Sequence, residues 1–358
     1  MKVIQLLTTV SMGDAVSNDT IALHDILLKN NYETGIYAEN IDSRLPKGLV
    51  KNYKNLPALK KEDVIIYHLS TGTALNDLIK TFKCRKIMIY HNVTPPGFFS
   101  EYSIISYELC KKGLDQTRDL NNTFDYVLAD SEFNKQDLIR MGYKCKIDVL
   151  PILIKFEDYE KKPNKLVMKK CDDGYINIIF VGRIAPNKKQ EDVIESFYYY
   201  NKYYNEKSRL ILVGSYGGME KYYARLKNYC EELGVKNVVF TGHIKFDEIL
   251  AYYHVADMFL CMSEHEGFCV PLVESMYFEV PIIAYDSCAI GGTLAGSGIL
   301  LKDKKVLETA GVMNYVLTHE DLKKQIVASE KERLNDFAHS VIETEFLAYL
   351  KSFIEKEI

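Results

Sequence analysis

Residues 264–276 read EHEGFCVPLVESM and follow Met258–Cys261, a short apolar run of the length expected for a buried strand. Pro271 suits the first turn of a helix, because its fixed φ and missing amide hydrogen cost nothing there. The stretch therefore predicts a strand, a turn and a helix, with Glu266 in the turn and Glu274 in the first helical turn. The free amides of a helix start favour an anion, so a carboxylate beside them indicates a separate task, such as accepting hydrogen bonds from ligand hydroxyls. On this pattern alone, the structural interpretation is favoured, in which Glu266 is a loop residue and Glu274 stabilises the helix start.

Outward from this stretch, short apolar runs alternate with amphipathic stretches through the second half of the chain. Strands are expected at Ile176–Val181, Leu210–Val213, Val238–Phe240, Met258–Cys261 and Pro281–Ala284, and helices at Gln190–Tyr203, Glu220–Leu233 and Asp247–Val255. Gly234 stands where a helix C-cap is expected. Strands that alternate with helices predict a parallel sheet covered on both faces.

The first half repeats the alternation with weaker patterns. Strands are expected at Val3–Leu7, Val64–His68, Lys86–Tyr90 and Tyr126–Ala129, and helices at Asn18–Lys29, Ser103–Lys112 and Glu132–Met141. Ser131 is a suitable N-cap for the last of these helices. The order of elements again predicts an α/β domain with a parallel sheet.

The chain is therefore expected to hold two Rossmann-like, doubly wound α/β domains that face each other across a cleft. The expected N-terminal domain covers residues 1–155, and a charged linker covers residues 156–174. The second domain covers residues 175–334, and a final helix within 335–358 is available to pack back on the first domain. Ligands of such domains lie at the carboxyl ends of the strands.

Composition excludes several classes of protein. The 358 residues are 47% hydrophobic and 26% charged, which argues against disorder, and the formal net charge of -4 argues against nucleic acid as a partner. None of the eight cysteines forms a CxxC pair or a zinc-type cluster with histidine. No signal peptide or run of about 20 apolar residues is present, so a cytoplasmic location is expected. Short lysine clusters leave peripheral contact with the inner membrane face open.

The second half resembles, motif by motif, the family 4 retaining glycosyltransferases, which adopt the GT-B fold. The residues that carry the resemblance are the EX7E pattern of EHEGFCVPLVESM (264–276), preceded by VGRIAPNKKQEDVI (181–194), LVGSYGG (212–218) and VVFTGHI (238–244) and followed by VPIIAYD (280–286). The first half matches more thinly, in SMGDAVSN (11–18), YHNVTPP (90–96) and ADSEFNKQDL (129–138). One departure is the segment 288–293, CAIGGT, where many relatives carry Pro-Glu-Thr, so the choice of donor is in doubt.

The resemblance implies a nucleotide-sugar donor and a role for each matching residue. Arg183 and Lys188 would hold the pyrophosphate and stabilise the departing nucleotide, and no metal ion or other cofactor is needed. Glu266 would bind hydroxyls of the transferred sugar, and Glu274 would bind the ribose. Backbone groups complete the expected donor site, those of Gly13, His243, Gly267, Phe268, Cys269 and Val270.

His91 follows a predicted strand, and the resemblance implies that it contacts the donor sugar near the anomeric carbon. His68 ends a neighbouring predicted strand and is a weaker candidate. The implied reaction moves a hexose from a GDP- or UDP-linked donor to a glycan or lipid-linked acceptor, by analogy in bacterial surface polysaccharide synthesis. Two alternatives stay open: a nucleotide-dependent oxidoreductase or epimerase, against which the missing G-x-G-x-x-G speaks, and an inactive sugar-nucleotide-binding relative that supports a partner subunit.

Overall fold

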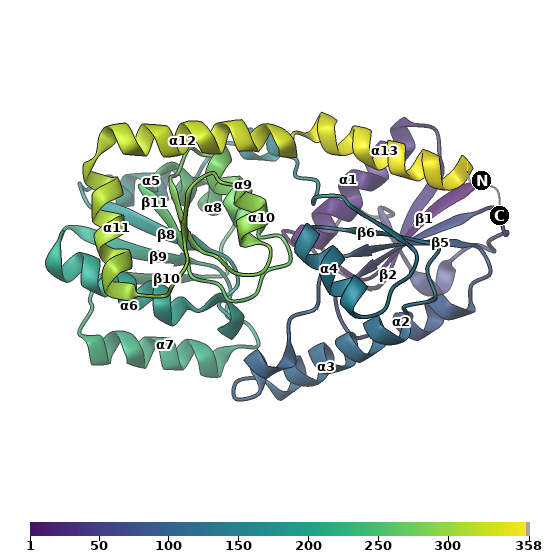
Figure 1. The fold of residues 1–358 in the computed structure, drawn as a ribbon, viewed down its shortest axis with the longest axis horizontal. Helices are drawn as coiled ribbons and strands as arrows, with labels where there is room; N and C mark the ends of the chain where they lie inside the picture. The colour runs from purple at the N-terminus through teal and green to yellow at the C-terminus, as the bar shows by residue number, and fades with distance from the viewer. Residues whose placement is uncertain (356–358) are drawn as a thin grey trace. The chain divides into compact units, whose positions relative to one another are not determined.

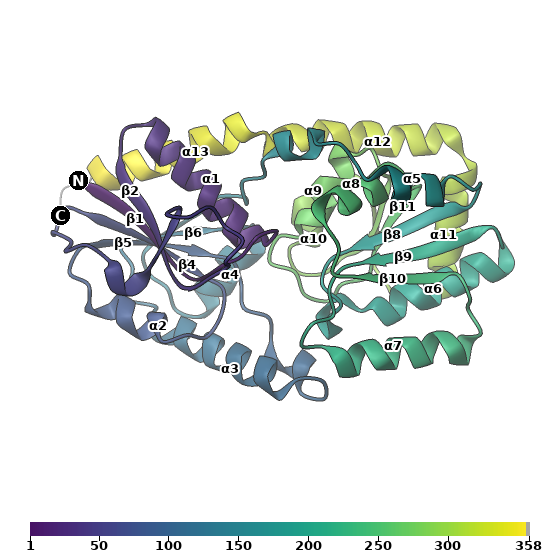
Figure 2. The same cartoon turned by 180° about the vertical axis from the view of Figure 1, so that it is seen from behind.

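The computed structural model describes residues 1–355, which fall into two compact α/β units. The first unit comprises Met1–Pro96, Tyr107–Lys155 and the stretch that begins at Asp336, and the second comprises Gly97–Ser106 and Phe156–Asn335. Each unit has one parallel sheet between layers of helices (Figures 1 and 2).

The sheet of the first unit has the strand order β3-β2-β1-β4-β5-β6-β7. Its strands are β1 (Lys2–Val10), β2 (Glu33–Ile41), β3 (Val50–Asn52), β4 (Val64–Leu69), β5 (Arg85–Tyr90), β6 (Tyr126–Ala129) and β7 (Lys146–Val149). All neighbouring pairs run parallel. Because both faces of such a sheet are covered, central strands such as β4 are buried along their whole length. The order reverses between β1 and β4, and ligands of doubly wound sheets bind at the carboxyl ends beside that reversal.

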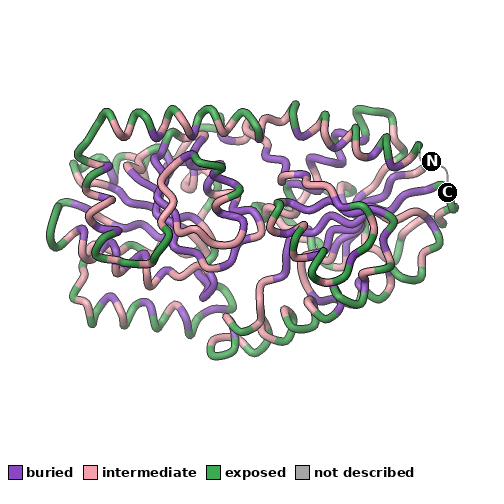
Figure 3. The backbone as a smooth tube through the Cα atoms, viewed as in Figure 1, coloured by how far each residue is buried: buried purple, intermediate pink, exposed green. Residues whose placement is uncertain are grey.

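Helices cover both faces of the first sheet and supply its two main apolar layers. One face carries α1 (Ala15–Lys29) and α13 (His339–Glu355), whose Leu23 and Phe346 pack with Ile66 and Ile89 of the sheet. The other face carries α2 (Leu75–Leu78), α3 (Ile104–Asp119) and α4 (Glu132–Arg140). The strands form the buried centre of the unit and the outer sides of the helices are exposed (Figure 3).

The sheet of the second unit has the order β10-β9-β8-β11-β12-β13, again with parallel neighbours. Its strands are β8 (Ile176–Val181), β9 (Ser208–Val213), β10 (Val238–Gly242), β11 (Met258–Cys261), β12 (Ile282–Tyr285) and β13 (Ile299–Leu301). The order reverses between β8 and β11. The loops that follow these two strands therefore meet at the place where such sheets bind ligands.

The helices of the second unit pack in pairs around this sheet. They are α5 (Lys165–Cys171), α6 (Gln190–Tyr203), α7 (Glu220–Leu233), α8 (Phe246–His254), α9 (Val270–Tyr277), α10 (Ile290–Leu294), α11 (Val306–Thr318) and α12 (Glu320–Leu334). Helix α6 packs against α11 and α7, α9 against α12, and α5 against α8. No helix within residues 1–355 has the length and apolar character needed to cross a bilayer.

Several expected boundaries differ from the structure. The expected linker 156–174 contains a 3-10 turn, Phe156–Glu160, and helix α5, and it belongs to the second unit. Residues 97–106, expected in the first domain, also belong to the second unit, where Tyr102 packs edge-on against Tyr222. The last helix starts at His339 rather than Asn335 because residues 335–337 form a separate 3-10 turn.

Helix α12 buries a carboxyl group that makes stability depend on pH. Glu330 is fully buried, and its Oε1 accepts a hydrogen bond from the Ile282 amide (2.9 Å). Oε2 is buried with no hydrogen-bond partner among the described residues. Burial raises the pKa of Glu330 from the ordinary 4.5 to about 8. The folded protein therefore keeps a proton that the unfolded chain releases between these two pH values.

We expect E330Q to be more stable than the parent protein in alkaline solution. A folded pKa above the unfolded one means that stability falls as pH rises from about 4.5 to about 8, by about 1.4 kcal/mol per pH unit. Glutamine keeps the bond to Ile282 and carries no charge, so its gain in the free energy of unfolding should approach roughly 5 kcal/mol at pH 8.5 and vanish near pH 4.5. Urea unfolding at several pH values measures this. A gain that is the same at every pH would contradict the assignment.

Candidate functional site

The loops after β8 and β11 bring the central charged pair of the second unit together. Glu264 N donates to the Asn187 carbonyl (2.8 Å), and Asn187 Nδ2 donates to the His265 carbonyl (3.1 Å). These bonds join the two loops beside the strand-order reversal. Lys188, at the end of the turn Pro186–Lys188, lies next to Glu266 as a result.

Lys188 and Glu266 form a short, largely buried ion pair. Lys188 Nζ lies 2.6 Å from Glu266 Oε1 and 2.5 Å from Oε2, and the Glu266 side chain is only 7% exposed. Although burial opposes it, the Glu266 carboxylate raises the pKa of Lys188. Lys188 is therefore held as an ammonium ion beside this carboxylate. The pair places a cation and an anion at one edge of the sheet, where each can bind a different part of a polar ligand.

Arg183 lies on the same loop but is exposed. Its Nη2 donates to the carbonyl of Gly217 (3.1 Å) in the loop that follows β9. The two loops approach closely at two glycines, since a Cβ on Gly214 would lie 2.0 Å from the Gly182 carbonyl oxygen. The glycines of the VGR and LVGSYGG motifs therefore allow the backbone contact that holds Arg183 beside the edge of the sheet.

We expect G214A to disrupt this loop pair strongly. Gly214 has φ 155°, and the 2.0 Å contact with Gly182 is with rigid backbone, so the loops must move apart. Overpacking of this kind costs about 1–3 kcal/mol of the free energy of unfolding. G217A is the matched control, because its Cβ would only reach the Ser215 hydroxyl at an ordinary 3.4 Å. Urea unfolding of both variants measures the effect, and equal stability would contradict the argument.

The first turn of α9 differs from the sequence prediction in one respect. Pro271 lies in the first turn, as expected, but Glu274 lies in the second turn because α9 begins at Val270. Glu274 Oε1 accepts from the Tyr159 hydroxyl (2.9 Å), and Oε2 accepts from the Tyr253 hydroxyl (2.6 Å). Burial raises the pKa of Glu274 while these two bonds oppose the shift. Sequence reasoning missed both tyrosines, since nothing in their local patterns marks them.

The other predicted donor residues of the second unit have varied environments. Phe268 is buried, and its carbonyl accepts from the Thr293 hydroxyl (2.6 Å), which ties α10 to this loop. Cys269 precedes α9 with φ 74°, a conformation that favours glycine. Gly267 and Val270 are partly exposed on either side of this buried pair, and His243 is exposed just after β10.

The segment 288–293, CAIGGT, contains a glycine whose presence the neighbouring side chains explain. A Cβ on Gly291 would lie 2.6 Å from Asp286 Oδ1, so a larger residue there would require that carboxylate to move. Asp286 also pairs with Lys302. An acidic group therefore does lie against this loop, although it comes from the end of β12.

The first unit presents its own residues at the reversal between β1 and β4. Gly13 has φ 80° in the turn after β1, and a Cβ there would meet no atom within 4 Å, so its conformation rather than close approach explains the glycine. Asp14 caps α1 by accepting from the Ser17 amide (2.9 Å). Across the reversal, His68 lies in β4 and His91 directly follows β5.

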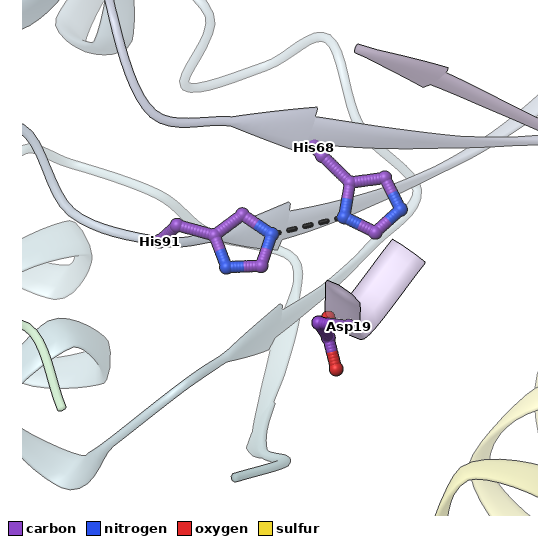
Figure 4. A group of neighbouring side chains, drawn as sticks. All are labelled: Asp19, His68 and His91. Carbon is purple, nitrogen blue, oxygen red and sulfur yellow. Dashed lines mark hydrogen bonds between the residues drawn. The ribbon is translucent and has the colours of Figure 1, made fainter. Parts of the chain in front are cut away.

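The two histidines form a head-on hydrogen bond. His68 Nδ1 lies 2.9 Å from His91 Nε2, and the ring planes differ by 5° (Figure 4). The ring centroids are 5.2 Å apart, which equals this contact plus the two ring radii, so the rings meet edge to edge rather than stack. His68 Nε2 faces Gln5 Oε1 (2.9 Å), and His91 Nδ1 faces Asp130 Oδ2 (2.9 Å).

The hydrogen bonds that link these side chains indicate where the protons lie. Gln5 Nε2 donates to the Thr20 carbonyl (2.9 Å), so Gln5 Oε1 must accept a proton from His68 Nε2. Burial holds the pKa of His68 well below its usual value, so His68 Nδ1 accepts from His91 Nε2. Although burial opposes it, the Asp130 carboxylate raises the pKa of His91. This direction favours a protonated His91 paired with Asp130 beside a neutral His68, although burial also raises the pKa of Asp130.

A second carboxyl group lies close to the histidine pair. Asp19 on α1 has an oxygen within 4.8 Å of one ring nitrogen of each histidine (Figure 4), and its Oδ1 accepts from the Leu153 amide (2.8 Å). Burial raises the pKa of Asp19 to about 7. Asp19, His68 and His91 have the ligand types of a metal site. Their two nitrogens, however, point at each other and share a proton, which leaves neither lone pair directed at an ion.

Sequence reasoning named His91 and His68 but missed their hydrogen-bond partners. Asp130 could have been predicted from the sequence. It directly follows β6, and a residue there reaches the same edge of the sheet as His91, which follows β5. Gln5 and Asp19 carry no such signal, since each lies within an element and only the fold buries it.

Comparison with known proteins shows which family the second unit resembles. The sequence model of the family described as "Glycosyl transferases group 1" matches residues 162–333, which lie within the second unit. The GalNAc-alpha-(1->4)-GalNAc-alpha-(1->3)-diNAcBac-PP-undecaprenol alpha-1,4-N-acetyl-D-galactosaminyltransferase of Campylobacter jejuni is 27% identical over 180 residues, 48% of this chain and 46% of that protein. The GDP-mannose-dependent alpha-mannosyltransferase of Mycobacterium tuberculosis is 25% identical over 249 residues, 68% of this chain and 61% of that protein.

Among solved structures, Anabaena Alr3699/HepE in complex with UDP and glucose aligns with a TM-score of 0.76. The alignment covers 98% of this chain and 100% of that one, at 16% sequence identity. At this identity the similarity shows the fold alone. Residues 162–333 therefore resemble the group 1 glycosyltransferases, and the chain has the fold of two Rossmann-like α/β units seen in GT-B structures.

Proposed function

We propose that the protein is a retaining, metal-independent glycosyltransferase that moves a hexose from a nucleoside-diphosphate donor to a glycan or lipid-linked acceptor. The observation that carries the proposal is the buried Lys188–Glu266 pair at the β8/β11 reversal of a unit that resembles the group 1 glycosyltransferases. A nucleotide sugar has an anionic diphosphate joined to a neutral, hydroxyl-rich sugar. A cation and an anion side by side suit the two parts of such a molecule.

In this proposal the diphosphate lies against Lys188, Arg183 and the first amides of α9. Lys188 and Arg183 stabilise the negative charge that grows on the leaving diphosphate, the task that a metal ion performs elsewhere. Glu266 accepts hydrogen bonds from hydroxyls of the transferred sugar. Glu274 accepts from the ribose, for which at least one of its bonds to Tyr159 and Tyr253 must rearrange.

The reaction itself is a substitution at the anomeric carbon. The bond from that carbon to the leaving phosphate oxygen breaks through an oxocarbenium-like state, and the acceptor hydroxyl bonds to the same face. A donor phosphate oxygen takes the hydroxyl proton, so no protein nucleophile is assigned. In this proposal His91 keeps the role that the sequence resemblance implies, contact with the donor sugar; its ring is only 1% exposed, so its bond to His68 must open first.

Two named relatives support a sugar-nucleotide donor and a glycan acceptor. The Mycobacterium relative is named for GDP-mannose, and the Campylobacter relative for an undecaprenol-linked acceptor. The serotype-specific mannosyltransferase WbdA of Escherichia coli matches 46% of this chain at 22% identity. We therefore place the reaction in the assembly of a bacterial surface polysaccharide, with a GDP- or UDP-linked hexose as the donor.

A donor screen tests the proposal. Purified protein is melted in the presence of GDP- and UDP-linked hexoses with EDTA added, and release of nucleoside diphosphate is followed in parallel. We expect one donor to raise the melting temperature and to be slowly hydrolysed. Stabilisation by a donor with no turnover, with acceptor extract supplied, would instead favour an inactive sugar-nucleotide-binding subunit.

A further inference from the structure

A cluster of two thiols and a carboxylate lies beneath the proposed donor site. Cys261 ends β11 and is fully buried, while Cys269 and Glu266 are each 7% exposed. The two Sγ atoms and a Glu266 oxygen all lie within 4.8 Å of one another. The thiols also form a hydrogen bond with each other, and Cys261 Sγ lies 3.4 Å from the Ser263 hydroxyl. The reaction proposed above uses neither thiol.

We propose that Cys261, Cys269 and Glu266 form a site for a thiophilic divalent cation, with Zn²⁺ as the best match, and that the ion inhibits donor binding. Two thiolates and one carboxylate are standard zinc ligands, and thiolates select soft ions over Mg²⁺. Zinc needs ligand atoms about 2.0–2.3 Å from the ion. Because the two Sγ atoms and the Glu266 oxygen already lie within 4.8 Å of one another, small side-chain rotations would bring all three to that distance from one ion. Water would fill the fourth position.

The charge of the cluster favours such an ion in spite of the nearby ammonium. With both thiols protonated, Glu266 and Lys188 sum to zero. Binding of Zn²⁺ with loss of the two thiol protons adds two positive and two negative charges, so the buried group stays neutral with Lys188 in place. Neither the empty nor the ion-bound cluster buries an uncompensated charge, which lowers the main cost of placing an ion there.

Inhibition follows from the shared carboxylate, and this part rests on the proposed function. A Glu266 oxygen that binds the ion cannot accept hydrogen bonds from the donor sugar. The ion and the donor therefore compete, and the enzyme should lose donor affinity in zinc and recover it with a chelator. The metal-independent reaction and the metal site are thus compatible, because the ion acts only as an inhibitor.

Cobalt(II) is the probe, because thiolate ligation gives charge-transfer absorption in the near-ultraviolet and a tetrahedral site gives strong visible bands. We expect the full-length protein to bind one Co²⁺ with both signals, to release two protons per ion, and to exchange Co²⁺ for Zn²⁺. C261A and C269G should lose the thiolate signal. Cys269→Gly should also fold well, since glycine suits φ 74° at this position.

C288S is the matched control, because the Cys288 thiol contacts the Glu264 carbonyl (3.3 Å) and is not part of the cluster. It should leave the cobalt spectrum unchanged. Absence of charge-transfer absorption in the parent protein, or its persistence in both C261A and C269G, would overturn the proposal. Competition is read separately: a cobalt spectrum that no nucleotide sugar reduces would count against the proposed function and the inhibition, while the metal site would stand.

Discussion

Replacing Lys188 with methionine is expected to lower the free energy of unfolding by about 3–5 kcal/mol and donor turnover by about 100- to 1,000-fold. The stability loss arises because Glu266 would remain buried with its charge unpaired. The loss in turnover arises because no ammonium would be left to stabilise the departing diphosphate. Urea unfolding and nucleotide release measure the two effects independently.

A double variant separates these two effects. K188M/E266L removes both charges and should regain most of the lost stability, because apolar residues can replace a buried pair at little cost. It should remain as inactive as K188M. The adjacent Lys189 is the control: it lies 3.5 Å from Glu264 in a more exposed pair, so K189M should cost less than about 1 kcal/mol. Recovery of activity together with stability would show that Lys188 only supports the fold.

Replacing Asp130 with asparagine is expected to reduce turnover by about 100-fold or more and to move the upper pH limit of activity downward. In the parent protein, Asp130 raises the pKa of His91. The imidazolium therefore persists as the pH rises above 6.5, the ordinary pKa of histidine. Without that carboxylate, burial dominates and His91 loses its proton at lower pH. Asp19 and Asp14 still face His91 and only partly replace the lost charge.

The pH profile of kcat distinguishes this effect from a general loss of structure. D137N is the matched control, because Asp137 lies on α4 and contacts the Tyr90 hydroxyl (3.3 Å) outside the histidine chain. It should leave the pH profile unchanged. A D130N protein whose profile coincides with that of the parent would show that His91 does not act as an imidazolium.

Much of the fold could be predicted because the central strands are buried on both faces. Largely apolar runs such as Ile176–Val181 and Met258–Cys261 match the observed β8 and β11 without change. The strands that were missed lie nearer the sheet edges. Strand β2 contains glycine and exposed polar residues. Strands β3 and β13 have only three residues each, which is too short to show an alternation of apolar and polar residues.

Helix α12 escaped prediction for a different reason. Only Ile326 and Glu330 are buried along its 15 residues, so its buried face includes a carboxyl group. An apolar period of 3.6 cannot reveal such a helix. The same physical fact gives the pH dependence expected of E330Q.

The candidate site was predictable only where a motif marks a strand end. Arg183, Lys188, Glu266 and His91 all follow buried strands, which places them at the carboxyl edge of a sheet. Their partners depend on strand order, which the sequence does not reveal. Lys188 meets Glu266 only because β8 and β11 are neighbours in the sheet.

The central claim is that this protein transfers a sugar from a nucleotide donor without a metal ion and with retention of configuration. The most direct measurement is proton NMR of the sugar product as it first forms, in EDTA, with the donor found by the screen and a matching acceptor. We predict release of nucleoside diphosphate and a product with the donor's anomeric configuration, both abolished in E266Q. A product of inverted configuration, or transfer that E266Q leaves intact, would contradict the account.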